Sequence, residues 1–271
     1  MPERWLTGVV TCQDKNSDHQ YCHWTDAEID AFVAAVYPAF VGIFRRYPYP
    51  IQRADAARYL ILHRYGGVYV DLDIECRVSF TSILSTIDYT RRRRRRRSGG
   101  AGGDVGTPPI AMPTAGFETV LAVAQPTGVV GDFIASQRRS PFLRHVVAGL
   151  PEAAASRWYR VMPYLTVMTS TGPWYLSGRL SSHCRCSFVG SGAGGCDRLY
   201  VLSADLYGHI YFHHLAGASW HRLDGRVIWF LFSRRRRISF VLLCVAGGCL
   251  CLPVLLWYRR SRCSLSARVS K

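Results

Sequence analysis

Two carboxylates two residues apart are the part of the sequence best suited to chemistry. Asp71 and Asp73 flank Leu72 directly after the apolar run Val68-Tyr69-Val70. Mg²⁺ and Mn²⁺ prefer oxygen ligands of this kind, and they typically bind one or two protein carboxylates and complete their shell with water and substrate phosphates. If the strand continued through the motif, both side chains would share one face. The pair therefore predicts a metal site for a diphosphate-bearing ligand.

The same triplet also has a plainer interpretation. Short acidic motifs occur by chance, and they often end a strand or face solvent. The position of this one favours a site, because side chains at the carboxyl end of a strand project into the ligand crevice of an open α/β sheet. The preceding elements therefore decide between the two interpretations.

A helix, a glycine turn and a strand lead into the carboxylates. The spacing of apolar residues predicts a helix from Ile51 to Tyr65, which Gly66-Gly67 would end. The β-branched and aromatic run Val68-Tyr69-Val70 predicts a buried strand. Asp55 and Arg58 stand three residues apart on the helix, a spacing that permits a shared site. Without the neighbouring motif, an ordinary intrahelical ion pair would be the favoured interpretation.

The rest of the chain supplies further elements of both kinds. A helix is predicted from Trp24 to Tyr47, with Thr25 as its N-cap and acidic residues in its first turn. Pro141 to Leu150 predicts an amphipathic helix, and strands are predicted within Ile110 to Val130 and Leu165 to Met168. The expected class is α/β.

The block around the carboxylates resembles the signature of a known enzyme family. Residues 53–73 read RADAARYLILHRYGGVYVDLD, which is similar to the DXD-containing sugar transferases, a group that includes initiating α-1,6-mannosyltransferases and inositol phosphorylceramide mannosyltransferases. The sphingolipid branch matches best. It also shares Trp24-Thr25-Asp26, Tyr47-Pro48-Tyr49-Pro50-Ile51, Gly131 to Ser136, Ser140-Pro141-Phe142, Ser170 to Pro173 and Gly217 to His221.

This resemblance implies a GT-A-like nucleotide-sugar-binding fold. It implies GDP-mannose as the donor, Mn²⁺ (or Mg²⁺) as the metal, and transfer with retention of configuration to an inositol phosphorylceramide acceptor. It also implies a Golgi or other secretory-pathway membrane with a lumenal catalytic domain, and it allows for a regulatory subunit.

On the donor side, the resemblance assigns roles to residues near the motif. Asp55 and Arg58 would hold the donor sugar and its phosphate side. Asp71 would contact the ribose and, with Asp73, the metal, while Tyr69 would line the nucleotide-sugar pocket.

A later segment would complete the site. His221 is the candidate that closes the site over the metal and the diphosphate, with Ser219 and Trp220 beside it in the nucleotide-sugar pocket. His213 and His214 are its rivals for that role.

Asp132 is expected to act on the acceptor side. Together with Asp55 and Arg58 it makes up the predicted catalytic set. The metal would neutralise charge on the departing diphosphate while Asp55 and Arg58 orient the sugar ring, leaving the acceptor hydroxyl to attack the anomeric carbon. No protein nucleophile is evident in the sequence.

Three features depart from the family pattern. Members normally begin with a strand containing an Ile-His-Gln-Thr-like segment, and this chain starts just after it, near Trp5, so we expect that strand to be missing. Gly131 stands where relatives usually carry a polar residue, and the stretch Val227 to Phe232 is unfamiliar. The acceptor prediction is therefore weaker than the donor prediction.

The formal charge of +16 does not by itself indicate a nucleic-acid partner. Much of the excess lies in two runs, Arg91 to Arg97 and Arg234 to Arg237. The first run continues into a glycine-rich stretch without the aromatic residues that stack on bases, so we interpret residues 91–107 as a disordered surface loop and expect no nucleic acid.

The ten cysteines contain no CxxC pair. Cys12 and Cys22 are close enough in sequence to form a disulfide in an oxidising lumen. A zinc site at Cys184, Cys186 and Cys196 is the less favoured interpretation of that cluster.

A membrane anchor is predicted near the C-terminus. Ile238 to Trp257 are 20 residues without a charge, and a helix of that length spans about 30 Å of hydrocarbon. Arginines abut both ends, so the segment predicts a transmembrane helix over 238–258 of undecided orientation, after a catalytic domain over 1–232 and before a basic tail over 259–271. Met1 to Val10 contain no signal-peptide h-region.

Two alternatives to sphingolipid mannosyl transfer stay open. The acceptor could be an N-glycan or a protein. In a different class, the chain could be an inactive membrane-associated protein whose arginine runs hold anionic lipid headgroups. The intact carboxylates argue against the inactive protein, and the missing first strand argues for it.

Overall fold

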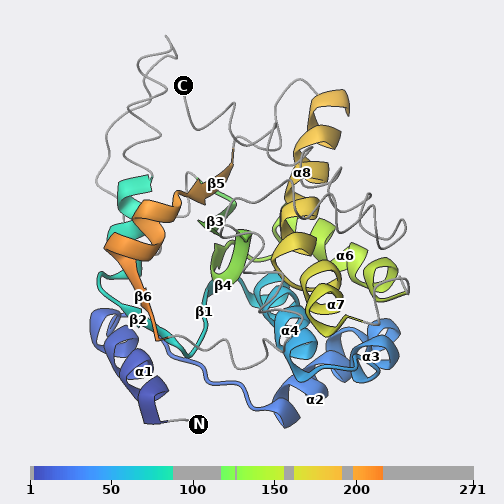
Figure 1. Ribbon diagram of the computed structural model, residues 1–271, viewed down its shortest axis with the longest axis horizontal. Helices are drawn as coiled ribbons and strands as arrows, with labels where there is room; N and C mark the ends of the chain where they lie inside the picture. The colour runs from blue at the N-terminus through green and yellow to red at the C-terminus, as the bar shows by residue number, and fades with distance from the viewer. Residues whose placement is uncertain (1–2, 88–116, 126, 156–161, 191–197, 216–271) are drawn as a thin grey trace, which may run out of the picture.

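The computed structural model describes residues 3–87, 117–125, 127–155, 162–190 and 198–215 (Figure 1). These ranges contain both helices and strands, and the strands form a sheet covered by helices, which confirms the α/β class. The predicted loop 91–107, transmembrane helix 238–258 and basic tail 259–271 lie outside the described residues. Within those residues, no helix combines the length and apolar character needed to cross a membrane.

A mixed four-stranded sheet forms the centre, in the order β1-β4-β3-β5. Its strands are β1 (Gly67–Val70), β4 (Gly128–Ser136), β3 (Thr119–Ala124) and β5 (Leu199–Leu202). β4 runs antiparallel to both β1 and β3, and β5 runs parallel to β3. A separate antiparallel pair joins β2 (Ile74–Cys76) to β6 (Phe212–His214).

The helices lie on both sides of the sheet, as Figure 1 shows. Their bounds are α1 (Glu3–Lys15), α2 (Asp26–Val36), α3 (Pro38–Arg45), α4 (Pro50–Tyr65), α6 (Pro141–Ala155), α7 (Pro163–Ser170), α8 (Pro173–Gly190) and the π-helix η1 (Leu206–Tyr211). Residues 80–87 are also helical. Helices α2, α3, α4, α6, α7 and α8 gather on one side, and α1 lies with β2 and β6 on the other.

The alternation of side chains along the strands creates two cores. Leu121 and Ile134 point into a core shared with α2, α3, α4, α6 and α8. Their neighbours Val120 and Phe133 point into a second core, which β2, the 80–87 helix, η1 and β6 complete. The sheet thus buries both faces.

Local predictions near the motif are confirmed. Helix α4 ends at Tyr65, and Gly66 follows with φ of +72°, a conformation that glycine adopts without steric cost. Thr25 caps α2 through a reciprocal pair of hydrogen bonds with Glu28. The amphipathic helix predicted from Pro141 is α6, and it extends to Ala155.

Two predictions from apolar patterns are wrong. The helix predicted from Trp24 to Tyr47 is broken at Tyr37, because Pro38 starts a new helix and cannot donate the backbone hydrogen bond that would continue the first. Leu165 to Met168 belong to α7 and not to a strand. A short apolar run cannot distinguish a strand from a buried helix by periodicity alone.

The predicted disulfide between Cys12 and Cys22 is also wrong. Cys12, on α1, is bonded to Cys76 at the end of β2, with 4.8 Å between their Cα atoms. Cys22 is exposed and free. Nearness in sequence misled here, because α1 turns its Cys12 toward a strand 64 residues away. Cys184 is itself disulfide-bonded, which removes one ligand from the less favoured zinc site.

Candidate active site

The motif Asp71-Leu72-Asp73 forms a tight turn between β1 and β2. Strand β1 ends at Val70, and the amide of Ile74 donates to the carbonyl of Asp71 at 3.2 Å. The two carboxylates therefore do not share a strand face, which corrects that expectation. They do lie at the carboxyl end of β1, where an α/β sheet presents its ligand crevice.

Distant segments hold the backbone of this turn. The amide of Asp71 donates to the carbonyl of Asp132 at 2.9 Å. The carbonyl of Asp73 accepts from the amide of Leu215 at 2.8 Å. Because β4 and the chain after β6 supply these partners, the turn is fixed by residues that are far from it in sequence.

A buried arginine joins α4 to the turn. The Nη2 atom of Arg58 lies 2.8 Å from Oδ1 of Asp55 and 3.5 Å from Oδ1 of Asp71. Its guanidinium group stands over the ring of Tyr69, 4.9 Å from the centroid. The hydroxyl of Tyr69 donates to Oδ1 of Asp71 at 2.7 Å. The structure thus brings together Asp55, Arg58, Tyr69 and Asp71.

The second oxygen of Asp55 is also bonded. The hydroxyl of Thr171 donates to Oδ2 at 3.1 Å, and the hydroxyl of Tyr59 donates to the carbonyl of Thr171 at 2.8 Å. This fixes α4 against the junction between α7 and α8. Burial raises the pKa of Asp55 to about 6 in spite of the opposite effect of Arg58.

Arg58 keeps its charge in this buried place. Burial favours the neutral guanidine, but the carboxylates of Asp71 and Asp55 and the rings of Tyr69 and Tyr59 outweigh it, so its pKa stays well above the usual range. Its Nε atom has no partner among the described residues. A fixed positive charge beside an accessible carboxylate is suited to orient a phosphorylated sugar.

Strand β4 bulges where it passes this arginine. The β3–β4 pairing jumps from Leu121 with Ile134 to Ala122 with Val130, leaving Gly131 to Phe133 without paired residues on β3. A Cβ atom on Gly131 would stand 2.8 Å from Nη1 of Arg58. The glycine that departs from the family pattern therefore makes room for Arg58, and bulges next to active sites often re-aim a side chain.

Asp132 lies in that bulge, close to β6 and η1. Its Oδ2 is 3.3 Å from Nε2 of His214, which is also 2.7 Å from the hydroxyl of Tyr207. Its Oδ1 is buried and has no partner among the described residues. Burial and the nearby Asp71 raise the pKa of Asp132 to about 6. An unpaired buried acceptor next to the motif is suited to a ligand hydroxyl.

The residues of the later segment divide into two groups. Both histidines are exposed, but His214 reaches the site through Asp132, whereas His213 lies 3.0 Å from Glu75. Ser219, Trp220 and His221 lie outside the described residues. Sequence reasoning missed Tyr207, and no local pattern marks it. It enters the site because η1 precedes β6 directly.

The donors near the turn fit a hard divalent cation. Asp71 and Asp73 are carboxylates, and the side chain of Asp71 is 29% exposed. No group of three or more histidine, cysteine, aspartate or glutamate residues in the described ranges could hold a metal alone. Mg²⁺ and Mn²⁺ need no such cage, because water and substrate phosphates complete a shell begun by one or two carboxylates.

Comparison with known proteins agrees with this geometry. Residues 2–90 match the family described as a glycosyltransferase sugar-binding region containing a DXD motif. Inositol phosphoceramide mannosyltransferase 1 of Schizosaccharomyces pombe is 30% identical over 270 residues, covering 97% of this chain and 72% of that protein.

Two further relatives are similar over nearly all of this chain. Inositol phosphoceramide mannosyltransferase 3 of S. pombe is 30% identical, covering 89% of this chain and 58% of the relative. Mannosyl phosphorylinositol ceramide synthase CSH1 of Saccharomyces cerevisiae is 31% identical, covering 92% of this chain and 55% of the relative. The chain thus spans a little over half the length of these two proteins.

Proposed function

Since the chain belongs to the DXD-motif glycosyltransferase family that includes the inositol phosphoceramide mannosyltransferases, we propose that it transfers mannose from GDP-mannose to an inositol phosphorylceramide. The proposed fold for this reaction is of the GT-A type. The observation that carries the proposal is the cluster of Asp55, Arg58, Tyr69 and Asp71, which places one buried cation beside a partly exposed carboxylate at the end of β1.

On the donor side, Asp55 orients Arg58, and Arg58 faces the sugar and its phosphates. A divalent cation, proposed to be Mn²⁺, would be held by Asp71 and Asp73 and would supply positive charge to the diphosphate leaving group. Divalent metal use is general in DXD glycosyltransferases, so the donor set and the family agree on this point. Ser219, Trp220 and His221 remain proposed contacts of the donor.

On the acceptor side, Asp132 is the proposed contact. Its buried Oδ1 has no partner among the described residues and could accept a hydrogen bond from an inositol or sugar hydroxyl. His214 on β6 lies against its other oxygen, and the hydroxyl of Tyr207 on η1 contacts that histidine. This arrangement would align an acceptor hydroxyl beside the donor.

The proposal places the enzyme in a secretory-pathway membrane such as the Golgi, with its catalytic domain in the lumen and residues 238–258 as the anchor. The disulfide between Cys12 and Cys76 supports an oxidising compartment. A regulatory subunit is compatible with this assignment.

The test is metal-dependent transfer by the whole chain in membranes. We would supply GDP-mannose, Mn²⁺ and inositol phosphorylceramide, and compare the wild type with Asp71→Asn and Asp73→Asn. Asp26→Asn, at an exposed carboxylate in the first turn of α2, is the matched control. We expect chelation to abolish transfer, and both motif variants to lose about 100-fold or more while the control keeps its activity.

Parallel arms separate the alternatives. Transfer to N-glycans or proteins and not to the lipid would change the acceptor. Transfer from UDP-sugars would change the donor. If the folded wild type neither transfers sugar nor binds GDP in the presence of Mn²⁺, the enzyme assignment is wrong, and binding to anionic vesicles would then favour the inactive alternative.

A further inference from the structure

We propose that helix α1 positions the metal-binding turn, and that Gly8 is the residue through which it does so. The inference builds on the proposed function, because it assigns α1 a part in holding Asp71 and Asp73 where transfer needs them. Gly8 would act as a positioning residue, since it contacts the turn and not the substrates. It was not marked by any sequence pattern.

The contact between α1 and the turn is a direct approach of two backbones. A Cβ atom on Gly8 would stand 2.8 Å from the carbonyl oxygen of Leu72 and 2.7 Å from that of Ile74. Leu72 is the central residue of the motif, and Ile74 begins β2. No side chain larger than hydrogen fits this contact unless the turn or the helix moves.

Covalent and polar links fasten α1 in this place. The disulfide joins Cys12 to Cys76, one turn of helix beyond Gly8. The hydroxyl of Thr11 accepts from the amide of Cys76 at 3.3 Å and donates to the carbonyl of Gly8 at 2.9 Å. Because these links converge on β2, the helix cannot withdraw from the turn while β2 stays paired.

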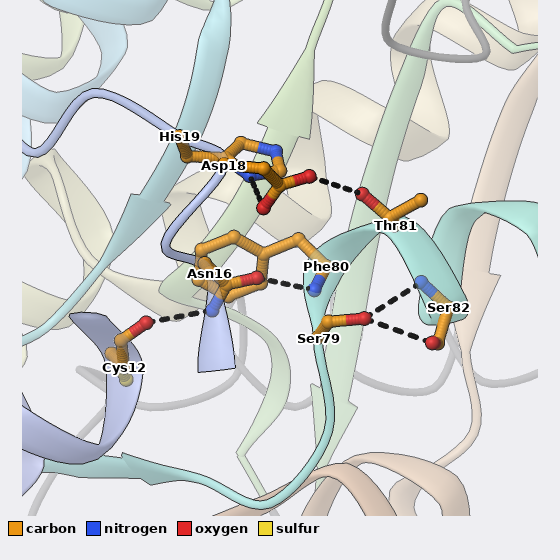
Figure 2. A network of polar contacts seen from close by, with 8 residues as sticks. All are labelled: Cys12, Asn16, Asp18, His19, Ser79, Phe80, Thr81 and Ser82. Atoms are coloured by element: carbon orange, nitrogen blue, oxygen red, sulfur yellow. Dashed lines mark hydrogen bonds and ion pairs between the residues drawn. The ribbon is translucent and has the colours of Figure 1, made fainter. Parts of the chain in front are cut away.

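Asn16 extends the link to the segment after β2, as Figure 2 shows. Its Nδ2 donates to the carbonyl of Cys12 at 2.8 Å, and its Oδ1 accepts from the amide of Phe80 at 2.6 Å. The side chain is 4% exposed. In the same view Thr81 donates to Asp18 at 3.5 Å. Both sides of β2 are therefore tied to α1 or to the residues just after it.

Hydrogen bonds also fix the turn on the side opposite to α1. The carbonyl of Asp73 accepts from Leu215, and the amide of Asp71 donates to Asp132. A turn held between α1 on one side and β4 and the residue after β6 on the other can change position only if one of these supports moves. A side chain added at Gly8 should therefore displace the carboxylates of the turn. Displacements of about 1 Å in an active site can lower the rate about 100-fold.

Three glycine-to-alanine variants of the full chain test this proposal. Gly8→Ala crowds the turn. Gly149→Ala crowds α6 away from the site, where a Cβ atom would stand 2.6 Å from the Arg179 guanidinium. Gly42→Ala on α3 has no atom within 4 Å of its new methyl group. All three glycines are helical, so the gain in helix propensity is shared.

Hydrogen exchange of a peptide covering residues 70–77 reads the turn directly. We expect faster exchange there in Gly8→Ala than in either control, because the amides of Asp71, Ile74 and Cys76 are bonded within the turn and its supports. Mannosyl transfer should fall about 10-fold or more in Gly8→Ala alone, with a higher Mn²⁺ concentration needed for half-maximal activity. Thermal midpoints identify any loss due to unfolding.

Two results would overturn the inference. One is unchanged exchange over 70–77 in Gly8→Ala. The other is altered exchange with transfer and Mn²⁺ requirement equal to those of Gly149→Ala. Failure of the proposed function looks different: the wild type itself would show no transfer, and the exchange comparison would still decide whether α1 sets the turn.

Discussion

Asp55 and Asp71 share one arginine, but the structure supports them in opposite ways. Asp55 lies on α4 with a side chain 9% exposed, and its partners Arg58 and Thr171 occupy both of its oxygens. Asp71 lies in a turn, is 29% exposed, and depends for its position on β4. On the helix, Asp55 is buried and both of its oxygens have partners, whereas Asp71 in the turn is still accessible to a ligand.

This difference suggests that Asp55 orients Arg58 and that Asp71 binds the cation. A buried, fully bonded carboxylate such as Asp55 has little capacity left for a ligand, so we expect it to position Arg58. A partly exposed carboxylate on a tightly held turn can take up a cation without rearranging. The following predictions test that division, and they run from the largest expected effect to the smallest.

Removing the shared cation should be the most damaging change. Arg58→Met leaves Asp55 buried without its main partner, and breaking a buried pair in this way typically costs about 3–5 kcal/mol. Denaturant unfolding measures the loss. Arg53→Met, on the same helix but only half-buried, should cost far less.

A double variant then sharpens the result. Asp55→Asn combined with Arg58→Met removes both charges and should recover part of the stability, but not transfer. If Arg58→Met alone is as stable as the wild type, Asp55 does not depend on this arginine, and the division between the two carboxylates is wrong.

Reducing the disulfide between Cys12 and Cys76 should lower the stability of the region that holds the turn. Cys12 and Cys76 enclose a loop set by a sequence separation of 64, for which the chain-entropy estimate is about 4 kcal/mol. Thermal midpoints with and without reductant measure it, and Cys12→Ser/Cys76→Ser should reproduce the reduced wild type without responding to reductant. Equal midpoints for the oxidised and reduced wild type would contradict the prediction.

A methyl group added beside Arg58, between Asp55 and Asp71, should reduce stability by an intermediate amount. Gly131→Ala puts a methyl group 2.8 Å from Nη1 of Arg58, and overpacking of this kind typically costs about 1–3 kcal/mol. Transfer should fall as well, because Arg58 must leave its place between Asp55 and Asp71. Gly208→Ala, with no atom within 4 Å, is the control. If Gly131→Ala is destabilised but transfers sugar normally, the position of Arg58 does not matter for the reaction.

The smallest expected effect is on the pH dependence of stability, and it comes from His145, which lies outside the site. Burial, with Arg179 and His183, lowers the pKa of His145 to about 4, below the unfolded value of about 6.5. Unfolded chains therefore take up this proton first, so its contribution to stability is complete above pH 6.5 and declines as the pH falls toward 4. His145→Gln should reduce the loss of stability over this window. An unchanged pH profile would exclude the role.

Local signals predicted the part of the site that one stretch of chain builds. Spacing of apolar residues gave α4, paired glycines gave its end, and Val68 to Val70 gave β1, so Asp55, Arg58 and the motif could be ordered correctly along the chain. The resemblance to sugar transferases then joined them into one site and added Asp132. Their roles in transfer remain predictions.

What the sequence left unpredicted depends on contacts between distant residues. The turn at Asp71 is held by β4 and by the residue after β6, the bulge at Gly131 forms only against β3, and Cys12 bonds to a cysteine on β2. None of these has a local pattern. The two misread segments failed for a local reason, because Pro38 is compatible with a helix start as well as with its end, and short apolar runs suit either kind of element.

The hydrogen bond between Asp73 and Leu215 also bears on when the site forms during synthesis. These residues are 142 apart in number (215 − 73), so the turn stays without one of its supports until that length has been translated. At about 5–20 residues per second, this delay is roughly 7–30 s. A ribosome-bound chain that ends before β6 would therefore carry the complete DXD motif without a complete site.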